Sequence, residues 1–248
     1  MNFQKRKQII LQKLNDGGEV DIKQLAAELI ISEITIRRDL NQLADDGLLY
    51  RTHGGAMKVD PLQVPHDFVN KAAKNMEAKD KICRAAAKLI NHGDIIFMDC
   101  GSTVFRLCQF IKSKKIKVIT NSMPVVYELQ NSLVSLNIIG GEFDAERQAV
   151  HGKMANEHIG RYKATKAFLG IDGISRNGLF ANSELEADIT SAFAAQSAKT
   201  YLLCDDSKIG KESYLKFGKL KTINAIITNS KSEELTYFKE QGIEIIGV

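Results

Sequence analysis

The apolar residues of this chain follow two different periods. Near the N-terminus the period is helical: at about 100° per residue, Ile36, Leu40 and Leu43 fall within about 60° of one another and form one core-facing stripe. A second stripe of this kind runs through residues 22–29, and a tight turn at 30–32 joins the two. This order of helix, turn and helix is typical of a helix-turn-helix.

From about residue 77 the pattern changes to short apolar runs separated by helical stretches. The predicted strands lie at residues 94–98, 118–120, 136–139, 167–169, 201–203, 225–227 and 243–246. Alternating strands and helices predict an α/β domain with a mostly parallel, Rossmann-like sheet that is covered on both faces. Pro61 and Pro65 interrupt helix and strand between the two parts. We therefore expect a two-domain chain, with domains at 1–58 and 76–248 and a linker at 59–75.

The outer surface of the helix that contains Ile36 carries groups suited to DNA. Arg38 lies about 200° from Ile36 and must point outward. That surface also holds Thr35, Arg37, Asn41 and Gln42, with Ser32 at the expected N-cap. Such a helix fits the major groove, where arginine pairs with guanine and Thr, Asn and Gln read other base edges. Because a carboxylate repels phosphate, we expect Asp39 to hold an arginine in place. Two arginines taken alone are equally typical of a solvated helix face.

A short hairpin, the wing, is predicted after this helix. Asp46-Gly47 predicts a turn, residues 48–53 a strand, and Gly54-Gly55 the tip of the hairpin. In this arrangement Arg51 and His53 face the phosphates or an adjacent minor groove. His53 taken alone is also typical of an ordinary surface histidine.

Polar motifs follow several of the predicted strands, where ligands bind in parallel sheets. Asp99-Cys100-Gly101-Ser102-Thr103 comes directly after a strand and opens a helix. Glycine there permits close approach, hydroxyls donate, and a helix N-terminus favours an anion. Further motifs follow other strands at Thr120-Asn121-Ser122, Gly140-Gly141, 170–174 and 205–210. Their convergence indicates an anion site, although a Gly-Ser-Thr turn alone is often only a helix cap.

Composition adds little to this pattern. The 248 residues are 44% hydrophobic, enough for a sizeable core, and the net charge of +4 is a weak argument for nucleic acid. In residues 1–58 bases are matched by acids, so DNA binding must rely on where charge is placed. The four cysteines form neither a C-x-x-C pair nor a zinc pattern. No apolar stretch reaches about 18 residues. We expect a cytoplasmic protein with no metal, no cofactor and no membrane span.

The N-terminal part resembles the DNA-binding domain of the DeoR family of bacterial transcriptional repressors. The matching residues are 32–40, Leu43, Gly47, Arg51 and 53–56. The resemblance implies a winged helix-turn-helix, a C-terminal sugar-phosphate sensor, and a homodimer or homotetramer that binds paired sites on a double-stranded DNA operator. The expected DNA-binding residues are Ser32, Thr35, Arg37, Arg38, Asn41, Gln42, Arg51, His53, Gly54 and Gly55.

The resemblance extends over the C-terminal part through the motifs at 99–103, 120–121, 140–141, 170–174 and 207–208. The family's sensor domain resembles ribose-5-phosphate isomerase in fold. By this similarity Gly101, Ser102 and Thr103 would cradle a phosphate, Lys208 would add positive charge, and Asp172, Asn121 and Glu184 would bond sugar hydroxyls. Asp99 and Gly141 complete the expected effector site. Three alternatives stay open: Glu186 in place of Glu184 faces the site, Asp172 only caps a turn, or Lys208 only pairs with Asp205 or Asp206.

The leading hypothesis is a repressor of a carbohydrate-catabolic operon that a phosphorylated sugar releases from DNA, with no catalytic residues. A sugar-phosphate isomerase-like enzyme, using Asp172, Lys208 or a glutamate as acid–base groups, is the alternative; it leaves residues 1–58 unexplained. A ligand-binding module that acts through a protein partner is a third class. The identity of the sugar, the operator, and repression as against activation stay open at this stage.

Overall fold

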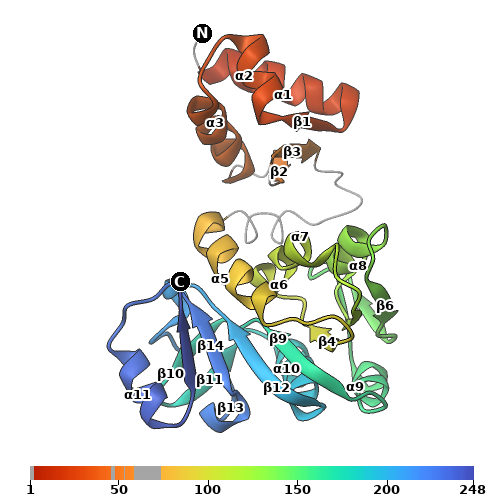
Figure 1. Cartoon of the computed structure of the whole chain (residues 1–248), viewed down its shortest axis with the longest axis vertical. Coiled ribbons are helices and arrows are strands. Elements are labelled where there is room, and N and C mark those ends of the chain that lie inside the picture. The colour runs from red at the N-terminus through yellow and green to blue at the C-terminus, as the bar shows by residue number, and fades with distance from the viewer. Residues whose placement is uncertain (1–2, 46–47, 53, 59–73) are drawn as a thin grey trace. The chain divides into compact units, whose positions relative to one another are not determined.

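The computed structural model describes residues 3–45, 48–52, 54–58 and 74–248. The chain divides into two compact units, Met1–Lys74 and Asn75–Val248 (Figure 1). The predicted turn at 46–47, His53 and most of the predicted linker, with both of its prolines, lie outside the described residues. None of the helices in the described part has the length and apolar content that crossing a bilayer requires.

The N-terminal unit is a helix-turn-helix with a small antiparallel sheet. Its elements are α1 (Phe3–Gly17), β1 (Glu19–Asp21), α2 (Ile22–Leu29), α3 (Glu33–Asp45), β2 (Leu49–Arg51) and β3 (Gly55–Lys58). The strand order is β1-β3-β2. The predicted stripe of Ile36, Leu40 and Leu43 is fully buried, and it packs with Ile10 of α1 and Leu25 of α2. The burial of these three residues confirms the prediction, made from helical periodicity, of which side of α3 faces the core.

The wing differs in register from the prediction. Gly55 is the first residue of β3 and pairs with Asp21, so it is not the hairpin tip. A Cβ atom at Gly55 would lie 1.8 Å from the Val20 carbonyl oxygen, so only glycine lets β3 pack against β1 here. The carbonyl of Gly54 accepts the Ile22 N–H at 2.8 Å. The hairpin is thereby joined to the first residue of α2.

The turn between α2 and α3 passes through an unusual residue. Ile30 has φ 53 and ψ 50, the left-handed region, and its side chain is 89% exposed. The next N–H, of Ile31, reaches back to the Ala26 carbonyl at 3.1 Å and closes the end of α2. A β-branched residue in this conformation is disfavoured by about 1–2 kcal/mol. The angle between the two helices is therefore set at some cost in stability.

The C-terminal unit is built on a parallel sheet of seven strands in the order β15-β14-β12-β9-β4-β5-β6 (Figure 1). The strands are β4 (Ile95–Met98), β5 (Lys117–Thr120), β6 (Ser135–Ile138), β9 (Ala164–Leu169), β12 (Ser197–Leu203), β14 (Ala225–Thr228) and β15 (Glu244–Gly247). All neighbouring pairs are parallel. Each strand overlaps one of the apolar runs in the sequence, so the predicted parallel α/β sheet is confirmed.

Both faces of this sheet are buried, as the near-continuous apolar runs predict. On one face Phe97 stacks on Phe193 of α10 with ring centroids 4.6 Å apart. On the other, Phe168 and Tyr201 stack at 5.3 Å. The helices are α5 (Met76–Lys88), α6 (Ser102–Arg106), α7 (Cys108–Ile111), α8 (Met123–Leu129), α9 (Lys153–Ile159), α10 (Glu184–Ala195) and α11 (Glu234–Glu240), with short 3₁₀ segments at Asp206–Lys208 and Leu220–Thr222.

Two small antiparallel sheets were not predicted. One is the hairpin of β7 (Glu142–Asp144) and β8 (Ala149–His151); the other has the order β10-β11-β13, with β10 (Gly173–Ser175), β11 (Gly178–Ala181) and β13 (Leu215–Gly218). These strands have three or four residues each, which is too short for an alternating pattern to stand out. They belong to the connections that follow the main strands.

The strand order fixes where a ligand site is expected. From β4 the chain moves outward on one side through β5 and β6, and then returns to the other side of β4 and moves outward through β9, β12, β14 and β15. The direction changes between β4 and β9. Parallel sheets bind ligands beyond the carboxyl ends of strands at such a switch point. The loops that start at Asp99 and Gly170 leave the sheet at this point.

Candidate functional site

The outward side of α3 carries the predicted polar surface. Arg37, Arg38, Asn41 and Gln42 are exposed and Thr35 is half-buried. The hydroxyl of Ser32 accepts the Thr35 N–H at 3.3 Å, which is the predicted N-cap. Arg37 pairs with Glu33 one turn earlier at 3.2 Å. Arg38 is therefore the arginine of this pair best placed to meet a base edge.

Asp39 holds an arginine, as expected, and that arginine is Arg6 of α1. The carboxylate is 5% exposed and accepts hydrogen bonds from Arg6 Nε and, at 2.9 Å, from Arg6 Nη2. Two donors from one guanidinium to one carboxylate fix the geometry of both groups. The pair joins α1 to α3 and so sets the direction in which the outer surface of α3 points.

Arg51 does not face outward, which corrects the prediction for the wing. Its side chain is buried; Nε donates to Asn41 Oδ1 at 3.0 Å and Nη1 donates to the carbonyl of Gly55. A buried guanidinium needs such acceptors, and the backbone of the wing supplies one of them. Arg51 therefore positions Asn41 and the wing. Of the other expected wing residues, Gly54 is exposed, and His53 lies outside the described residues.

Ile34 is a surface residue that the sequence reasoning missed. Its side chain is 72% exposed, and it lies one helical turn before Arg38 on the same outer side of α3. Apolar side chains at this end of a recognition helix can contact the thymine methyl group. The signal was available, because about 200° separates Ile34 from the buried Ile36.

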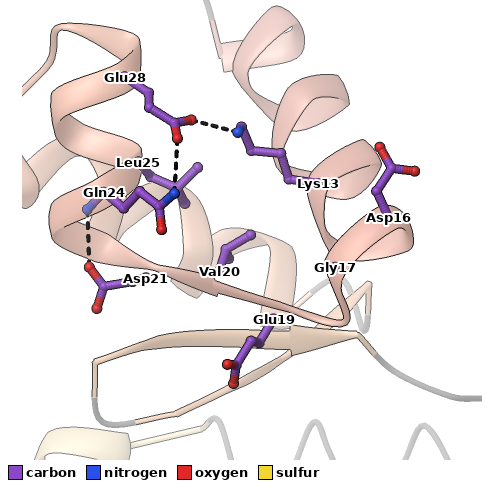
Figure 2. Close-up of a pocket in the computed structure, with 9 residues that line it drawn as sticks. All are labelled: Lys13, Asp16, Gly17, Glu19, Val20, Asp21, Gln24, Leu25 and Glu28. Atoms are coloured by element: carbon purple, nitrogen blue, oxygen red, sulfur yellow. Dashed lines mark hydrogen bonds and ion pairs between the residues drawn. The ribbon is translucent and has the colours of Figure 1, made fainter.

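A pocket in the N-terminal unit has the wrong charge for an anion (Figure 2). It measures about 360 Å³ and is lined by Lys13, Asp16, Gly17, Glu19, Val20, Asp21, Gln24, Leu25 and Glu28. Lys13 pairs with Glu28 at 2.6 Å, and four carboxylates surround this one lysine. Phosphate, of DNA or of a sugar, is therefore repelled from this pocket.

At the switch point of the C-terminal unit, Asp99 ties three elements together. Its carboxylate is 5% exposed and accepts the N–H of Cys100 at 2.7 Å, the N–H of Gly170 at 3.1 Å and the hydroxyl of Thr190 at 3.1 Å. Burial raises the pKa of Asp99, while these hydrogen bonds lower it. Asp99 was predicted to bind the effector; its carboxylate instead joins the ends of β4 and β9 to α10.

Gly101 also serves the contact between these loops. A Cβ atom on Gly101 would lie 3.1 Å from the Cα of Gly170, and the reverse distance is the same. The predicted close approach is thus between two chain segments. The helix that follows, α6, has only five residues, so its dipole supplies less to an anion than a long helix would. Ser102 is half-buried at its start, and Thr103 is buried beside it.

The positive charge at this point comes from Lys79 of α5, which the sequence reasoning missed. Lys79 is 5% exposed, and its Nζ donates to Ser102 Oγ at 3.2 Å. Burial lowers its pKa to about 8, with Asp205 acting in the opposite direction and Lys208 in the same one. The signal was a lysine on the apolar stripe of a helix: Lys79, Ile82, Cys83 and Ala86 follow the i, i+3, i+4, i+7 pattern.

Asp172 and Lys208 are brought together, each only partly exposed, with Nζ and Oδ1 3.8 Å apart. Asp172 also accepts the Asn182 N–H at 2.9 Å, so it caps a turn and faces a cation at once. Asp205 instead caps its own 3₁₀ segment by accepting the Ser207 N–H at 3.0 Å. The expected Asp172 and Lys208 therefore do lie side by side.

Between the two candidate glutamates the structure favours Glu186. Glu184 is exposed, whereas Glu186 pairs with Arg147 Nη1 at 2.5 Å and is only 21% exposed. The prediction named Glu184, whereas the first turn of α10 directs Glu186 toward the turn between β7 and β8. Arg147, on that turn, was not predicted, because nothing in a four-residue turn marks one arginine as inward-facing.

Asn121 and Gly141 lie where β8 meets the end of β5. Asn121 is fully buried and its Nδ2 donates to the Val150 carbonyl at 3.0 Å. Gly141 has φ 155, and a Cβ atom there would lie 2.7 Å from the His151 carbonyl oxygen. Gly141 therefore permits close packing of β7 on β8, and no direct role in ligand contact follows from its geometry.

The four cysteines, Cys83, Cys100, Cys108 and Cys204, are buried and unpaired. Burial raises the pKa of all four thiols. Buried, protonated thiols are poor nucleophiles and poor metal ligands. They act as small apolar side chains of the core.

Comparisons with known proteins match both units. A family model described as "DeoR C terminal sensor domain" matches residues 74–230, and one described as "DeoR-like helix-turn-helix domain" matches residues 6–61. The "Lactose phosphotransferase system repressor" of Staphylococcus epidermidis is 32% identical over 99% of this chain and 100% of its own length. The "L-fucose operon activator" of Haemophilus influenzae is 33% identical over 97% of each chain.

Two solved structures resemble this chain at less than 20% sequence identity. Ribose 5-phosphate isomerase A from Methanocaldococcus jannaschii has a TM-score of 0.40 and 19% identity, and 55% of each chain is covered. The translation initiation factor eIF-2B from Pyrococcus horikoshii has a TM-score of 0.47 and 18% identity, covering 91% of this chain and 87% of that one.

Proposed function

This chain belongs to the DeoR family of DNA-binding transcriptional regulators, and we propose that it represses a carbohydrate-catabolic operon until a phosphorylated sugar binds its C-terminal unit. The observation that carries the proposal is the buried Lys79 beside Ser102 at the switch point of the sheet. A buried ammonium group beside a hydroxyl, at the carboxyl ends of parallel strands, favours an anionic ligand there. A phosphate bound there would receive charge from Lys79 and Lys208 and a hydroxyl from Ser102.

The DNA surface is the outer side of α3. Arg38 is proposed to pair with a guanine, with Thr35, Asn41 and Gln42 reading neighbouring base edges. One short helix reads few bases, so we propose a dimer or tetramer that binds paired half-sites about 34 Å apart. In this scheme Arg51 and Asp39 act indirectly, because they hold Asn41 and α3 in place.

Release from DNA is proposed to be a two-state linkage. The sugar phosphate favours a subunit arrangement in which the recognition helices no longer match the half-sites. To move the population from mostly bound to mostly released, the effector must prefer the released state by several kcal/mol.

The relatives support a sugar operon but differ in the direction of regulation. The Staphylococcus protein is named a repressor of a lactose phosphotransferase system, and the Haemophilus protein an activator of an L-fucose operon. Activation is therefore the second candidate. The same protein would activate if its operator lay where it helps polymerase and repress where it blocks polymerase.

The test is a fluorescence-anisotropy titration against labelled DNA from upstream of the protein's own gene and its neighbours, with random competitor and fixed salt. Each titration is repeated with glucose 6-phosphate, fructose 1-phosphate, ribose 5-phosphate and dihydroxyacetone phosphate. Specific binding that one of these releases is expected, with release lost in Lys79→Gln and DNA affinity lost in Arg38→Ala. Sugar-phosphate turnover with no DNA affinity for any genomic fragment would overturn the proposal in favour of an isomerase-like enzyme.

A further inference from the structure

The turn of the β7–β8 hairpin brings a second polar cluster to the same end of the sheet. Arg147 reaches from this turn to Glu186 at the start of α10, with Nη1 and Oε1 2.5 Å apart. Both side chains are partly exposed, at 25% and 21%. Sequence motifs do not mark this arginine, and the site described above gives it no role.

Charge links this pair to the phosphate end of the site. Burial lowers the pKa of the Arg147 guanidinium, but the carboxylates of Glu186 and Asp172 outweigh that effect and raise it. Asp172 in turn lies 3.8 Å from Lys208. Cation and anion therefore alternate from Lys208 through Asp172 and Arg147 to Glu186. Asp172 thus acts on both Lys208 and Arg147, and we expect a ligand anchored at the two lysines to extend toward Arg147.

The hairpin is held firmly against the end of β5. The Val150 N–H donates to the Asn121 carbonyl at 2.8 Å, and the Met123 N–H donates to the Gln148 carbonyl at 2.9 Å. Gln148 adopts φ 53, which turns the chain into this pairing directly after Arg147. The position of Arg147 is thus set by backbone hydrogen bonds on one side and by Glu186 on the other.

Where the hairpin meets the end of β5, two buried polar atoms lack hydrogen-bond partners among the described residues. They are Asn121 Oδ1 and Ser122 Oγ. Both side chains are 0% exposed. Buried polar groups are nearly always paired, so this layer indicates that a hydroxyl-bearing molecule or ordered water completes it.

We propose that Arg147 and Glu186 read the hydroxyl-bearing end of the effector, and that the effector is therefore a sugar monophosphate. A guanidinium fork beside a carboxylate offers donors and an acceptor with no net charge, which suits neutral hydroxyl groups. A second phosphate at this end would face the carboxylates of Glu186 and Asp172. This inference rests on the proposed function, because it assumes that a phosphate occupies the site at Lys79.

The test measures affinity by calorimetry for inorganic phosphate, glucose 6-phosphate, fructose 1-phosphate, fructose 6-phosphate, ribose 5-phosphate and fructose 1,6-bisphosphate. Arg147→Gln is expected to weaken the best monophosphate about 10- to 100-fold and to leave inorganic phosphate unchanged. Arg176→Gln is the matched control, because Arg176 forms a comparable ion pair with Glu234 at 3.1 Å elsewhere in the same unit. Thermal unfolding checks that each variant is folded. If Arg147→Gln does not fold, Arg147→Lys replaces it, because lysine keeps the positive charge but lacks the two-pronged guanidinium group.

The bisphosphate is expected to bind at least tenfold more weakly than the best monophosphate, and Glu186→Gln is expected to narrow that gap. The inference is overturned if Arg147→Gln behaves like Arg176→Gln, if it weakens inorganic phosphate equally, or if the bisphosphate binds as tightly as the monophosphates. If the wild-type protein binds neither inorganic phosphate nor any sugar phosphate, the proposed effector class fails as well, which separates the two failures.

Discussion

The side chains proposed to read DNA all come from one helix of the N-terminal unit, α3. The side chains proposed to bind the effector come from several segments of the C-terminal unit: α5, the loops after β4 and β9, the β7–β8 turn, α10 and a 3₁₀ segment. The first surface is local in sequence and the second converges from distant segments. A local surface can be read from helical periodicity. A converging site becomes visible only when the strand order is known.

The two surfaces also differ in how they hold charge. Arg38 is exposed, so its guanidinium group stays hydrated until DNA binds. Lys79 is buried before any ligand binds, and its depressed pKa reflects that burial. The proposed DNA surface therefore costs the fold little stability, while the buried lysine of the proposed effector site lowers the stability of the unit that contains it. Such a trade between stability and function is common at binding sites.

Gly55→Ala tests whether the two units are independent, and its expected effect is the largest. The added Cβ would meet the Val20 carbonyl at 1.8 Å, so β3 must separate from β1 at a cost of about 3 kcal/mol or more. DNA binding should be lost and effector binding retained. Gly54→Ala is the control, since its Cβ would lie 3.5 Å from the nearest atom, Asp21 Oδ2. Loss of effector binding in Gly55→Ala would show that the two units do not fold and bind independently.

Arg38→Ala should weaken operator binding by about 1–3 kcal/mol for each contacted base pair. Paired half-sites double the loss. Arg37→Ala is the neighbouring control and should cost less, because Arg37 is paired with Glu33. Anisotropy titrations at fixed salt measure both. Equal losses in the two variants would show that α3 presents general positive charge, without a specific role for Arg38.

Lys79→Met should stabilise the ligand-free protein at pH 7 by about 2 kcal/mol. The shift of its pKa from 10.5 to about 8 means that the buried charge lowers the free energy of unfolding by about 3 kcal/mol. The variant also loses favourable contacts of the ammonium group, among them the hydrogen bond to Ser102, which offset about 1 kcal/mol of that gain. Effector binding should be lost. Denaturant unfolding without ligand measures the gain, and Lys208→Met, at a partly exposed lysine, is the control. Destabilisation would mean that Lys79 serves packing.

Because Lys79 titrates near neutral pH, we expect effector binding to depend on pH, whereas DNA binding by α3 should not. Its lowered pKa means that the free site loses its charge as pH rises through about 8, so effector affinity should fall up to tenfold per unit above that pH. Calorimetry in buffers of different ionisation enthalpy should show uptake of about three-quarters of a proton per site at pH 8.5 and about a tenth of a proton at pH 7. DNA affinity should stay level across this range. Binding without proton uptake at pH 8.5 would remove Lys79 from the phosphate site.

Ile30→Gly should stabilise the N-terminal unit by about 0.5–1 kcal/mol, the smallest effect. Glycine relieves the left-handed strain at φ 53 but pays more backbone entropy, and the exposed isoleucine loses little packing. Ile34→Gly is the opposite control, because a helical position should lose about 1 kcal/mol. Thermal unfolding measures whether each variant is more or less stable than the wild-type protein. Lower stability in both variants would mean that the Ile30 side chain makes packing contacts that its exposure does not reveal.

Much of the fold could be predicted from the sequence because burial leaves a period. The stripe of Ile36, Leu40 and Leu43 and the seven apolar strands all follow it. The short strands β7 and β8 could not be predicted, since three residues carry no readable period. Motifs likewise singled out Ser102, Asp172 and Lys208 as candidates, but they did not show which atoms each side chain contacts.

The predictions for Arg51 and Asp99 differ from the structure for a common physical reason. Arg51 was expected to face DNA because it lies on the predicted strand of the wing, yet its guanidinium donates to a carbonyl of the wing itself. Asp99 was expected to face a ligand, yet its carboxylate satisfies two N–H groups and a hydroxyl. In both cases a polar side chain serves buried backbone groups. Sequence alone does not show which backbone groups lack partners.

The contact between Gly101 and Gly170 bears on how chains of this kind can diverge. A Cβ atom on either glycine would lie 3.1 Å from the Cα atom of the other, so a substitution at either one requires the two loops to shift by a few tenths of an ångström. The seam between β4 and β9 is therefore expected to change less readily than a contact between side chains. Arg147 and Glu186 meet through side chains that can be exchanged one at a time. A lineage that acquires a new inducer would be expected to alter the hairpin and to inherit the seam unchanged.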